Sequence, residues 1–406
     1  MSTSITSTRR REVFDFAVVG DGPVGLSSAL ALNKLGRSVV LIAASAPADA
    51  PTDTTPLDLR VYALAPDVLK FLATLGCSIQ AQPRACSYSS MRVFDADDAQ
   101  IEFNASDYGW PDLGCIVEHQ CLQAELWTQV QRCGIKQMIG QADAYQMEDA
   151  HAILHTSNDT VRARWVLDAS GANSKLRATA GIGVAEHDYQ QSAIVAHVRT
   201  EMPHAHTAWQ RFTAAGTIAL LPMFDGSQAL VYSALAAKAD ALVALDDQAF
   251  LRDLDGNFGL QLGHFTQIGM RRKIPLRRML ANAYVDGHLI LLGDSGHSVH
   301  PLAGQGLNLG IRDVARLCEA VLEALEGEEN VSGAKMQSAL RKFERERKSE
   351  NAITAYGIEA LQKLFLPASG PLKLLRNLGL RGVHRLTPIK RLFAELAAGQ
   401  VAGWPG

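Results

Sequence analysis

The chain has 406 residues, 47% of them hydrophobic, and a formal net charge of −3. This length allows two or more domains, and the near-neutral charge, with no basic stripe among aromatic residues, gives no basis for nucleic-acid binding. No stretch reaches the roughly 18 consecutive apolar residues of a membrane-spanning helix, and six cysteines without a CxxC pair or a secretory leader predict reduced thiols in the cytoplasm.

The first predicted element is a strand–helix–strand unit near the N-terminus. Its strand and helix are joined by Gly20-Asp21-Gly22-Pro23-Val24-Gly25. In such a loop Gly20 permits the tight turn, Gly22 lets the backbone approach a pyrophosphate, and Gly25 lets the helix pack on the strand. The helix, with Pro23 at its start, presents unpaired N–H groups and a positive dipole end to phosphates. The spacing predicts a dinucleotide site, although GxGxxG alone also occurs in ordinary strand–helix turns.

The second strand, residues 38–43, lacks the acidic residue that usually binds the ribose at its end. Ala43 stands at that position. Asp49 and Asp53 follow in a loop rich in Pro, Ala and Thr and could substitute, although a solvated loop acid is the preferred interpretation of each. The ribose contact therefore stays unassigned.

The middle of the chain alternates between helical and strand patterns. We expect a helix after Pro66 that ends at a glycine, strands within 91–103, a helix over 118–133, strands within 135–168 and a turn over 169–177. Strands at 190–199, 216–222 and 228–235, with one helix around 246–254, make residues 183–284 a mostly antiparallel insert. This insert is the natural wall of a substrate site.

The second Gly-rich motif runs from Leu291 to Asp313 and reads LLGDSGHSVHPLAGQGLNLGIRD. It follows an apolar strand over 289–292, so the chain returns to the buried sheet of the first domain. Helices over 311–325 and 335–364 come next. From Leu361 onward many Lys and Arg residues stand among Leu, Ile and Phe. We interpret this segment as helices docked on the body, with contact to a membrane surface as the alternative.

Three motifs together resemble the class A flavoprotein aromatic hydroxylases: GDGPVG at Gly20, SGANSKLR at Ser170 and GDSGHSVHPLAGQGLNLGIRD at Gly293. The resemblance is closest to the ubiquinone-biosynthesis hydroxylases and extends to TPIKRLFAELAAG near the C-terminus. It implies an α/β fold, in which a Rossmann-like FAD-binding domain carries an inserted, mostly antiparallel β-sheet substrate domain and C-terminal helices. The implied division is 1–182 with 285–345 for FAD, 183–284 for substrate, and 346–406 for the C-terminal helical segment, with a β segment at about 84–104 packing on the substrate domain.

The resemblance also implies FAD bound non-covalently by the second motif. Asp294 would bind the ribityl chain, since it follows a strand at the edge where open α/β sheets bind ligands. The backbone from Gly304 through Gln305, Gly306, Leu307 and Asn308 would lie near the pyrophosphate and isoalloxazine. Asn308 would cap the following helix or meet the ring. Pro301 and Gly304 would border the face where oxygen and substrate meet.

Other positions match the family less directly. Arg60 resembles the arginine that reaches the flavin phosphates, and Gln123 stands where relatives place a polar residue toward FAD. Ser170 stands where the family usually has Asp, while Arg177 is retained. No catalytic side chain is assigned, because the cofactor supplies the oxidising chemistry.

Metal and hydrolytic chemistry find no support in the sequence. His297 and His300 lie in a Gly/Pro loop without a third ligand nearby, so we predict no metal site. GxSxG and HExxH motifs are absent from the sequence.

The reaction implied by the resemblance is aromatic hydroxylation. NADH or NADPH would reduce FAD, oxygen would add at C4a, and the flavin hydroperoxide would hydroxylate a polyprenylated phenol of ubiquinone biosynthesis. The protein is expected in the cytoplasm or bound peripherally to the inner face of the membrane. It could form a homo-oligomer or belong to a quinone-biosynthesis complex. Two alternatives stay open: a hydroxylase of a soluble aromatic acid, and a flavin-poor scaffold subunit, which Ser170 and Ala43 suggest.

Overall fold

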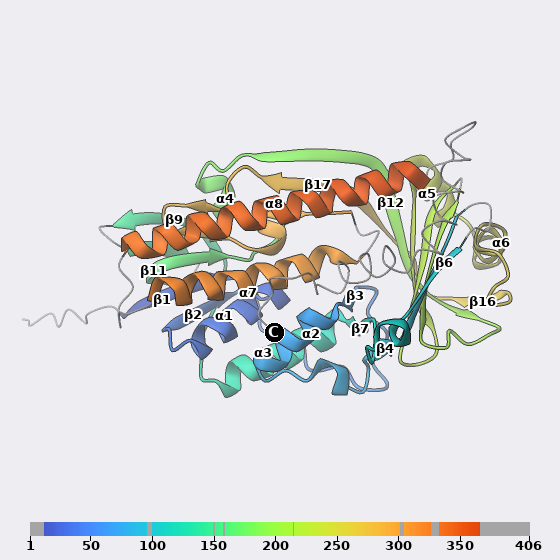
Figure 1. The fold of residues 1–406 in the computed structure, drawn as a ribbon, viewed down its shortest axis with the longest axis horizontal. Coiled ribbons are helices and arrows are strands. Elements are labelled where there is room, and N and C mark those ends of the chain that lie inside the picture. The colour runs from blue at the N-terminus through green and yellow to red at the C-terminus, as the bar shows by residue number, and fades with distance from the viewer. Residues whose placement is uncertain are drawn as a thin grey trace, which may run out of the picture.

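The computed structural model describes residues 12–95, 100–148, 151–156, 159–213, 215–300, 304–325 and 333–365. These residues form two large sheets, one small sheet and a set of packed helices (Figure 1). The α/β architecture expected from the sequence is confirmed.

The first large sheet carries the N-terminal strand–helix–strand unit. Its strands are β1 (Val13–Val19), β2 (Val39–Ala43), β8 (Lys136–Ile139), β9 (Ala142–Glu148), β10 (His151–Thr156), β11 (Thr160–Asp168), β18 (Val285–Asp286) and β19 (Leu289–Leu291). The order is β18-β19-β11-β1-β2-β8, and the pairs from β19 to β8 are parallel. Every residue of β2 is buried, as expected for a parallel strand covered on both faces. Leu291 of β19 lies opposite Asp168 of β11, so the chain does return to this sheet late in the sequence.

The helices pack against both large sheets. They are α1 (Pro23–Lys34), α2 (Pro66–Thr74), α3 (His119–Arg132), α4 (Lys175–Thr179), α5 (Ala236–Val243), α6 (Asp247–Phe258), α7 (Gln305–Leu325) and α8 (Gly333–Phe365), with 3₁₀ turns η1 (Ile79–Ala81), η2 (Ala105–Tyr108) and η3 (Gly293–Ser295). Helix α7 contacts both α1 and α8, and the long α8 runs across the molecule above α7 in Figure 1. Helix α7 is therefore the central helix of the nucleotide-binding half.

The second large sheet stands at the other end of the molecule (Figure 1). Its strands, in order, are β20 (His297–Ser298), β17 (Arg272–Ala281), β12 (Val184–Thr200), β15 (Gln228–Leu235), β14 (Gly216–Pro222), β13 (Thr207–Thr213), β5 (Ser90–Phe94) and β6 (Gln100–Asn104), with β16 (Phe265–Ile268) beside β12. All pairs are antiparallel except β13 with β5. Helices α5 and α6 pack their apolar side chains on one face of it. The division of the chain into separate domains stays a prediction.

A small antiparallel sheet lies between the two large ones. It consists of β3 (Val61–Leu64), β7 (Gly114–Glu118) and β4 (Cys86–Tyr88). Val61 pairs with Glu118, which brings Arg60 beside the start of α3. The sequence pattern did not identify this sheet, because its strands are short and far apart along the chain.

Several predicted boundaries are wrong in informative ways. The helix expected from residue 311 begins at Gln305, so the second Gly-rich motif already forms the first turn of α7. Helix α4 begins within the turn predicted over 169–177. The insert has two helices, because Ala-rich α5 follows β15 without a break. Strand β17 was missed because it contains Pro275. Pro275 pairs with Ser192 of β12, but among the described residues β20 pairs only with Met279 and Leu280 of β17, so the other edge of β17 has no partner strand beside Pro275.

No helix among the described residues combines the length and apolarity needed to cross a membrane. Pro301 and the basic segment after residue 365 lie outside the described residues.

Candidate functional site

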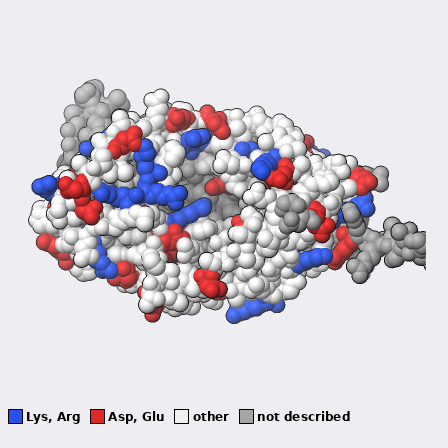
Figure 2. All heavy atoms as spheres, turned by 180° about the vertical axis from the view of Figure 1, so that it is seen from behind, with Lys and Arg blue, Asp and Glu red and all other residues white. Residues whose placement is uncertain are grey.

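One large cavity lies between the Gly-rich loops and the second sheet. Its volume is about 1500 Å³, above the roughly 300–1,000 Å³ usual for a single small-molecule ligand. Residues 19–24, 58–63, Ala65, Leu292, Asp294 and 304–308 line one side, and β5, β6, β12–β15 and β17 line the other. The face of the molecule seen from behind is hollowed near its middle, and Lys and Arg side chains gather beside the hollow (Figure 2). The cavity therefore has room for a cofactor and a substrate together.

The first Gly-rich loop is shaped by close backbone contacts. Gly20 has φ +128°, and a Cβ there would lie 2.3 Å from the carbonyl oxygen of Ala169. A Cβ on Gly25 would lie 2.1 Å from the carbonyl oxygen of Gly20, so helix and strand approach as the motif predicts. A Cβ on Gly22 would meet nothing within 4 Å, although Gly22 lines the cavity. Gly20 and Gly25 thus allow the turn, and Gly22 leaves space on the ligand side.

Two helix N-termini line the cavity. Helix α1 begins at Pro23 after Gly22, which makes no side-chain cap, and its first turn has no acidic residue. Helix α7 begins at Gln305 and likewise has no acidic residue in its first turn. Free backbone N–H groups and the positive ends of two helix dipoles therefore meet at one site, which favours an anionic ligand.

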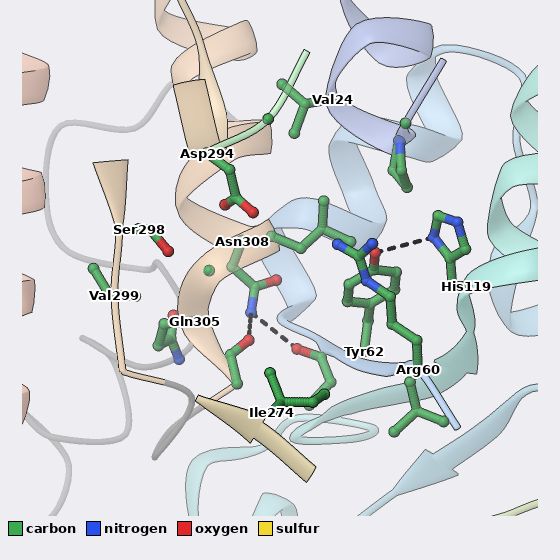
Figure 3. Close-up of a pocket in the computed structure, with 18 of the residues that line it drawn as sticks. Val24, Arg60, Tyr62, His119, Ile274, Asp294, Ser298, Val299, Gln305 and Asn308 are labelled. Carbon is green, nitrogen blue, oxygen red and sulfur yellow. Dashed lines mark hydrogen bonds between the residues drawn. The ribbon is translucent and has the colours of Figure 1, made fainter. Parts of the chain in front are cut away.

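The turn that carries Asp294 packs directly on α1. A Cβ on Gly293 would lie 3.1 Å from a methyl group of Val24, and a Cβ on Gly310 of α7 would lie 2.7 Å from the same side chain. Asp294 points into the cavity (Figure 3), and its carboxylate has no hydrogen-bond partner within the described part of the chain. A free carboxylate on a ligand cavity suits recognition of hydroxyl groups.

Asn308 joins α7 to the edge of the small sheet. Its Oδ1 accepts a hydrogen bond from the Ala65 N–H (3.0 Å), and its Nδ2 donates to the carbonyls of Ala63 (2.9 Å) and Gly304 (3.3 Å) (Figure 3). The side chain is 1% exposed. Asn308 is the fourth residue of α7, so it does not cap the helix from before its start, and its amide instead binds backbone groups of Ala63, Ala65 and Gly304.

Arg60, Tyr62 and His119 form a closed set of contacts on the cavity wall (Figure 3). The Arg60 guanidinium lies 5.4 Å from the centre of the Tyr62 ring, and the Tyr62 hydroxyl lies 3.0 Å from the ring nitrogen Nδ1 of His119. The backbone N–H of His119 donates to the backbone carbonyl of Arg60 (2.9 Å). Burial raises the pKa of Tyr62 to about 12, and burial together with the nearby Arg60 charge lowers the pKa of His119. At neutral pH Arg60 is therefore the cation of this set.

A buried ion pair supports the loop that precedes Arg60. Glu118 accepts from Arg84 Nε (2.7 Å) and Nη2 (2.9 Å), and also from the Asp58 N–H (2.6 Å). Asp58 in turn accepts from the Arg60 N–H (2.9 Å). Sequence reasoning missed this support, since Arg84 and Glu118 lie in separate elements with no shared motif.

Gln123 and Ser170 both line the cavity but also bind the protein itself. Gln123 Nε2 donates to the carbonyl of Asp21 (2.8 Å), which ties α3 to the first Gly-rich loop. Ser170 donates through its hydroxyl (2.6 Å) and its N–H (3.0 Å) to the buried carboxylate of Asp168. Burial raises the pKa of Asp168, although hydrogen bonds from Ser170 and Ser174 oppose the shift.

Arg177 joins the SGANSKLR motif to the motif that carries Asp294. It donates to the carbonyls of Ala172 (2.7 Å) and Ser295 (2.8 Å) and so holds the 170s turn against the turn of Asp294. The retained arginine therefore has a structural explanation.

Several candidates from the sequence do not meet at the cavity. Ala43 is fully buried in β2, and the exposed Asp49 and Asp53 are not among the lining residues, so the ribose contact stays unassigned. His297 donates to Asp313 (2.6 Å), and the ring of His300 packs on Tyr189 instead. Within the described ranges no group of three or more His, Cys, Asp or Glu residues could hold a metal ion.

The residues present fit FAD. Gly20 and Gly25 create a turn that side chains would fill, the N-termini of α1 and α7 together with Arg60 offer positive charge to a diphosphate, and Asp294 offers an acceptor to sugar hydroxyls. The cavity is also lined by apolar side chains of the second sheet. The site thus combines an anion-binding end with an apolar end.

Comparison with known proteins agrees with this geometry. The chain matches the family model described as an FAD-binding domain over residues 13–349. It is 31% identical to the 3-demethoxyubiquinol 3-hydroxylase of Escherichia coli (strain K12), over 95% of this chain and 98% of the relative. It is 33% identical to the ubiquinone hydroxylase UbiL of Rhodospirillum rubrum, over 96% of this chain and 90% of the relative.

The fold also matches the solved structure of p-nitrophenol 4-monooxygenase PnpA from Pseudomonas putida, with a TM-score of 0.78. The match covers 96% of this chain and 99% of that chain, at 16% sequence identity. At this identity the likeness supports the fold alone. The match of the family model and the long alignments with hydroxylases support the relationship itself. The chain therefore belongs to the FAD-binding class A flavoprotein monooxygenases, in the family that includes the ubiquinone-biosynthesis hydroxylases.

Proposed function

We propose that this chain is an FAD-dependent hydroxylase that uses NAD(P)H and O₂ to hydroxylate the ring of a polyprenylated phenol in ubiquinone biosynthesis. One observation carries the proposal: the cavity has the cofactor-type loops on one side and a wall of apolar strand residues on the other. A phenol with a hydrocarbon tail needs such a wall, because burial of apolar surface is its main source of binding energy. The names of the relatives support the same substrate class.

In this proposal the lining residues share the work of holding FAD. The turn into α1 is shaped by Gly20, Gly22, Pro23 and Gly25, and Gln123 fixes this first loop. Arg60 and the N-termini of α1 and α7 bind the diphosphate, and Asp294 binds the ribityl hydroxyls. The flavin ring is supported by the segment of Gly304, Gln305, Gly306, Leu307 and Asn308. When bound and reduced, FAD supplies the activation of O₂ for ring hydroxylation.

The chain's own task is to orient the arene and to exclude water from the reacting atoms. The apolar side chains of β5, β6 and β12–β15 close the cavity on the substrate side and keep water away from the ring. No nucleophilic side chain is needed, since the cofactor carries the oxidising chemistry.

We further propose that NAD(P)H docks transiently against the FAD-binding half. The sequence has no second GxGxxG loop that would make a dedicated nicotinamide domain. A hydrophobic substrate of this class would be collected at the inner membrane surface, so a peripheral location and association with other quinone-biosynthesis proteins, or with a second copy, belong to the same proposal.

The decisive experiment uses the purified full chain reconstituted with FAD. We expect flavin absorbance after gel filtration, oxidation of NADH or NADPH, and a product one oxygen atom heavier when a prenylated phenol is supplied. In a strain lacking the gene, mass spectrometry should reveal a quinone precursor that lacks one ring oxygen. A chain that takes up no flavin under any condition contradicts the proposal and favours the scaffold. Turnover of soluble aromatic acids alone favours the other hydroxylase class.

A further inference from the structure

A continuous row of side chains crosses the cavity face of the second sheet. The strand register places Val195 opposite Val231, Val231 opposite Ala219, Ala219 opposite Gln210, Gln210 opposite Val93, and Val93 opposite Ile101. All of them line the cavity. Five of these side chains are apolar, so Gln210 interrupts an otherwise apolar row.

The Gln210 side chain is buried yet lacks a partner. Gln210 is 7% exposed, and among the residues that the structure describes its carboxamide makes no hydrogen bond. Gln228 of β15, which β14 separates from the strand of Gln210, is 1% exposed; its Nε2 donates to the Thr200 hydroxyl (3.0 Å), while its buried Oε1 has no partner among the described residues. The protein therefore satisfies the amide nitrogen of Gln228, whereas neither polar atom of the Gln210 amide has a partner in the described part of the chain, and Gln210 lines the cavity.

An amide in such a place needs a ligand to complete it. A buried polar group without a partner costs roughly 1–3 kcal/mol, and most buried polar side chains in folded proteins are hydrogen-bonded. The carboxamide offers an acceptor oxygen and a donor nitrogen at one point of an apolar surface. A matching ligand presents a hydroxyl group on an otherwise apolar body.

We propose that Gln210 is the residue that recognises the phenolic hydroxyl of the substrate, while the Val and Ala side chains of the same row contact the apolar remainder. This inference rests on the proposed function, since it specifies how the same cavity selects a phenol. The phenol O–H donates to Gln210 Oε1, and Nε2 donates to the phenol oxygen or to a neighbouring oxygen substituent. A site built to bind a hydroxyl discriminates strongly against an analogue that lacks it, because the amide is then left unsatisfied.

The test compares two probes that differ in one oxygen atom, 2-geranylphenol and geranylbenzene. Their dissociation constants are measured from changes in protein and flavin spectra, for the FAD-loaded wild type and for Gln210→Met. The Met variant keeps the side-chain length but cannot replace the amide. We expect the preference for the phenol, taken as the ratio of the two dissociation constants, to fall about 5- to 10-fold in the variant, the size of one lost hydrogen bond.

A matched control separates recognition from packing. Val93→Ala changes the shape of the row beside Gln210 without changing its polarity, so it should weaken both probes equally and leave their ratio unchanged. Gln210→Met should also keep or raise the free energy of unfolding of the ligand-free protein, because it removes an unsatisfied amide. A purely structural glutamine would instead lower it.

The outcomes are distinct. An unchanged probe ratio in Gln210→Met, with wild-type binding intact, overturns the assignment of Gln210 and leaves the proposed hydroxylase function standing. Wild-type protein that holds FAD but binds neither probe overturns the proposed substrate class and this inference with it. A reduced ratio with preserved stability supports both.

Discussion

Asp313 of α7 and Arg347 of α8 form a buried ion pair in which Arg347 Nε donates to Asp313 Oδ1 at 2.7 Å. The other oxygen, Oδ2, accepts from the Gly293 N–H (3.0 Å) and from His297 Nε2 (2.6 Å). One carboxylate therefore joins the long C-terminal helix to the turn that presents Asp294 to the cavity. Through it, the docking of α8 and the shape of the proposed cofactor site are linked.

Breaking this pair should strongly destabilise the protein. In Arg347→Met the buried Asp313 carboxylate loses its guanidinium partner, and we expect a loss of about 3–5 kcal/mol in the free energy of unfolding. The double variant Asp313→Asn/Arg347→Met should lose less than the sum of the single variants. Urea unfolding gives the free energy of unfolding of Arg347→Met, Asp313→Asn and the double variant.

Lys342→Met is the matched control for that series. Lys342 pairs with Glu323 across the same two helices, but the side chains are 47% and 39% exposed, so the expected loss is below about 1 kcal/mol. Equal losses at the buried and exposed pairs would contradict the role of Asp313.

The same carboxylate should make stability depend on acid pH. Burial opposes ionisation of Asp313, but the charges and hydrogen bonds of His297 and Arg347 lower its pKa well below the usual value of about 3.9. A pKa lower in the folded state means that its stabilisation is complete above that usual value and is lost as the pH falls below it. Between pH 6 and pH 3, the wild type should therefore lose more unfolding free energy than Asp313→Asn/Arg347→Met. Parallel curves would exclude this contribution.

The two glycines of the first loop should respond differently to alanine. Gly20→Ala places a Cβ 2.3 Å from a carbonyl oxygen at a φ of +128°, so we expect loss of stability and of FAD. Gly22→Ala meets no protein atom within 4 Å and should fold normally, yet its methyl group enters the space proposed for the pyrophosphate. Thermal unfolding and flavin content distinguish the two variants. Normal FAD affinity in Gly22→Ala would argue against that placement.

Asn308→Ala should cost stability as well as cofactor affinity. The substitution leaves the Ala65 N–H and the Ala63 carbonyl without their partner, at roughly 1–3 kcal/mol for each buried group. Gln305→Ala is the control, since Gln305 makes no side-chain hydrogen bond within the described part of the chain and should change unfolding by less than about 0.5 kcal/mol. The measurement is unfolding of the flavin-free protein. An unaffected Asn308→Ala would contradict the joining role of this side chain.

Arg60 should act on the phosphates of the cofactor and not on its ring. Arg60→Met removes a charged donor worth about 1.5–3 kcal/mol, so the dissociation constant for FAD should rise roughly 10- to 100-fold. Riboflavin, which lacks the diphosphate, should bind wild type and variant alike. Fluorescence quenching measures both ligands. Equal weakening of FAD and riboflavin would place Arg60 elsewhere.

The sequence by itself determined the local parts of this site. Gly20, Gly22 and Gly25 sit between an apolar strand and an apolar helix, and that pattern predicts the turn because only glycine tolerates such close backbone contacts. The motif around Asp294 and Asn308 likewise indicated a second ligand loop, and resemblance joined the two into one FAD site. These are properties of short segments, which residue order records directly.

Only the tertiary structure decided how distant segments complete one another. The Asp313–Arg347 pair, the Arg84–Glu118 support and the unpartnered amide of Gln210 depend on strand register and helix packing, which set distances between residues far apart in the chain. A buried glutamine and a solvated one look alike in a sequence. Whether such a group is satisfied by the protein or left for a ligand follows from the surroundings that folding brings to it.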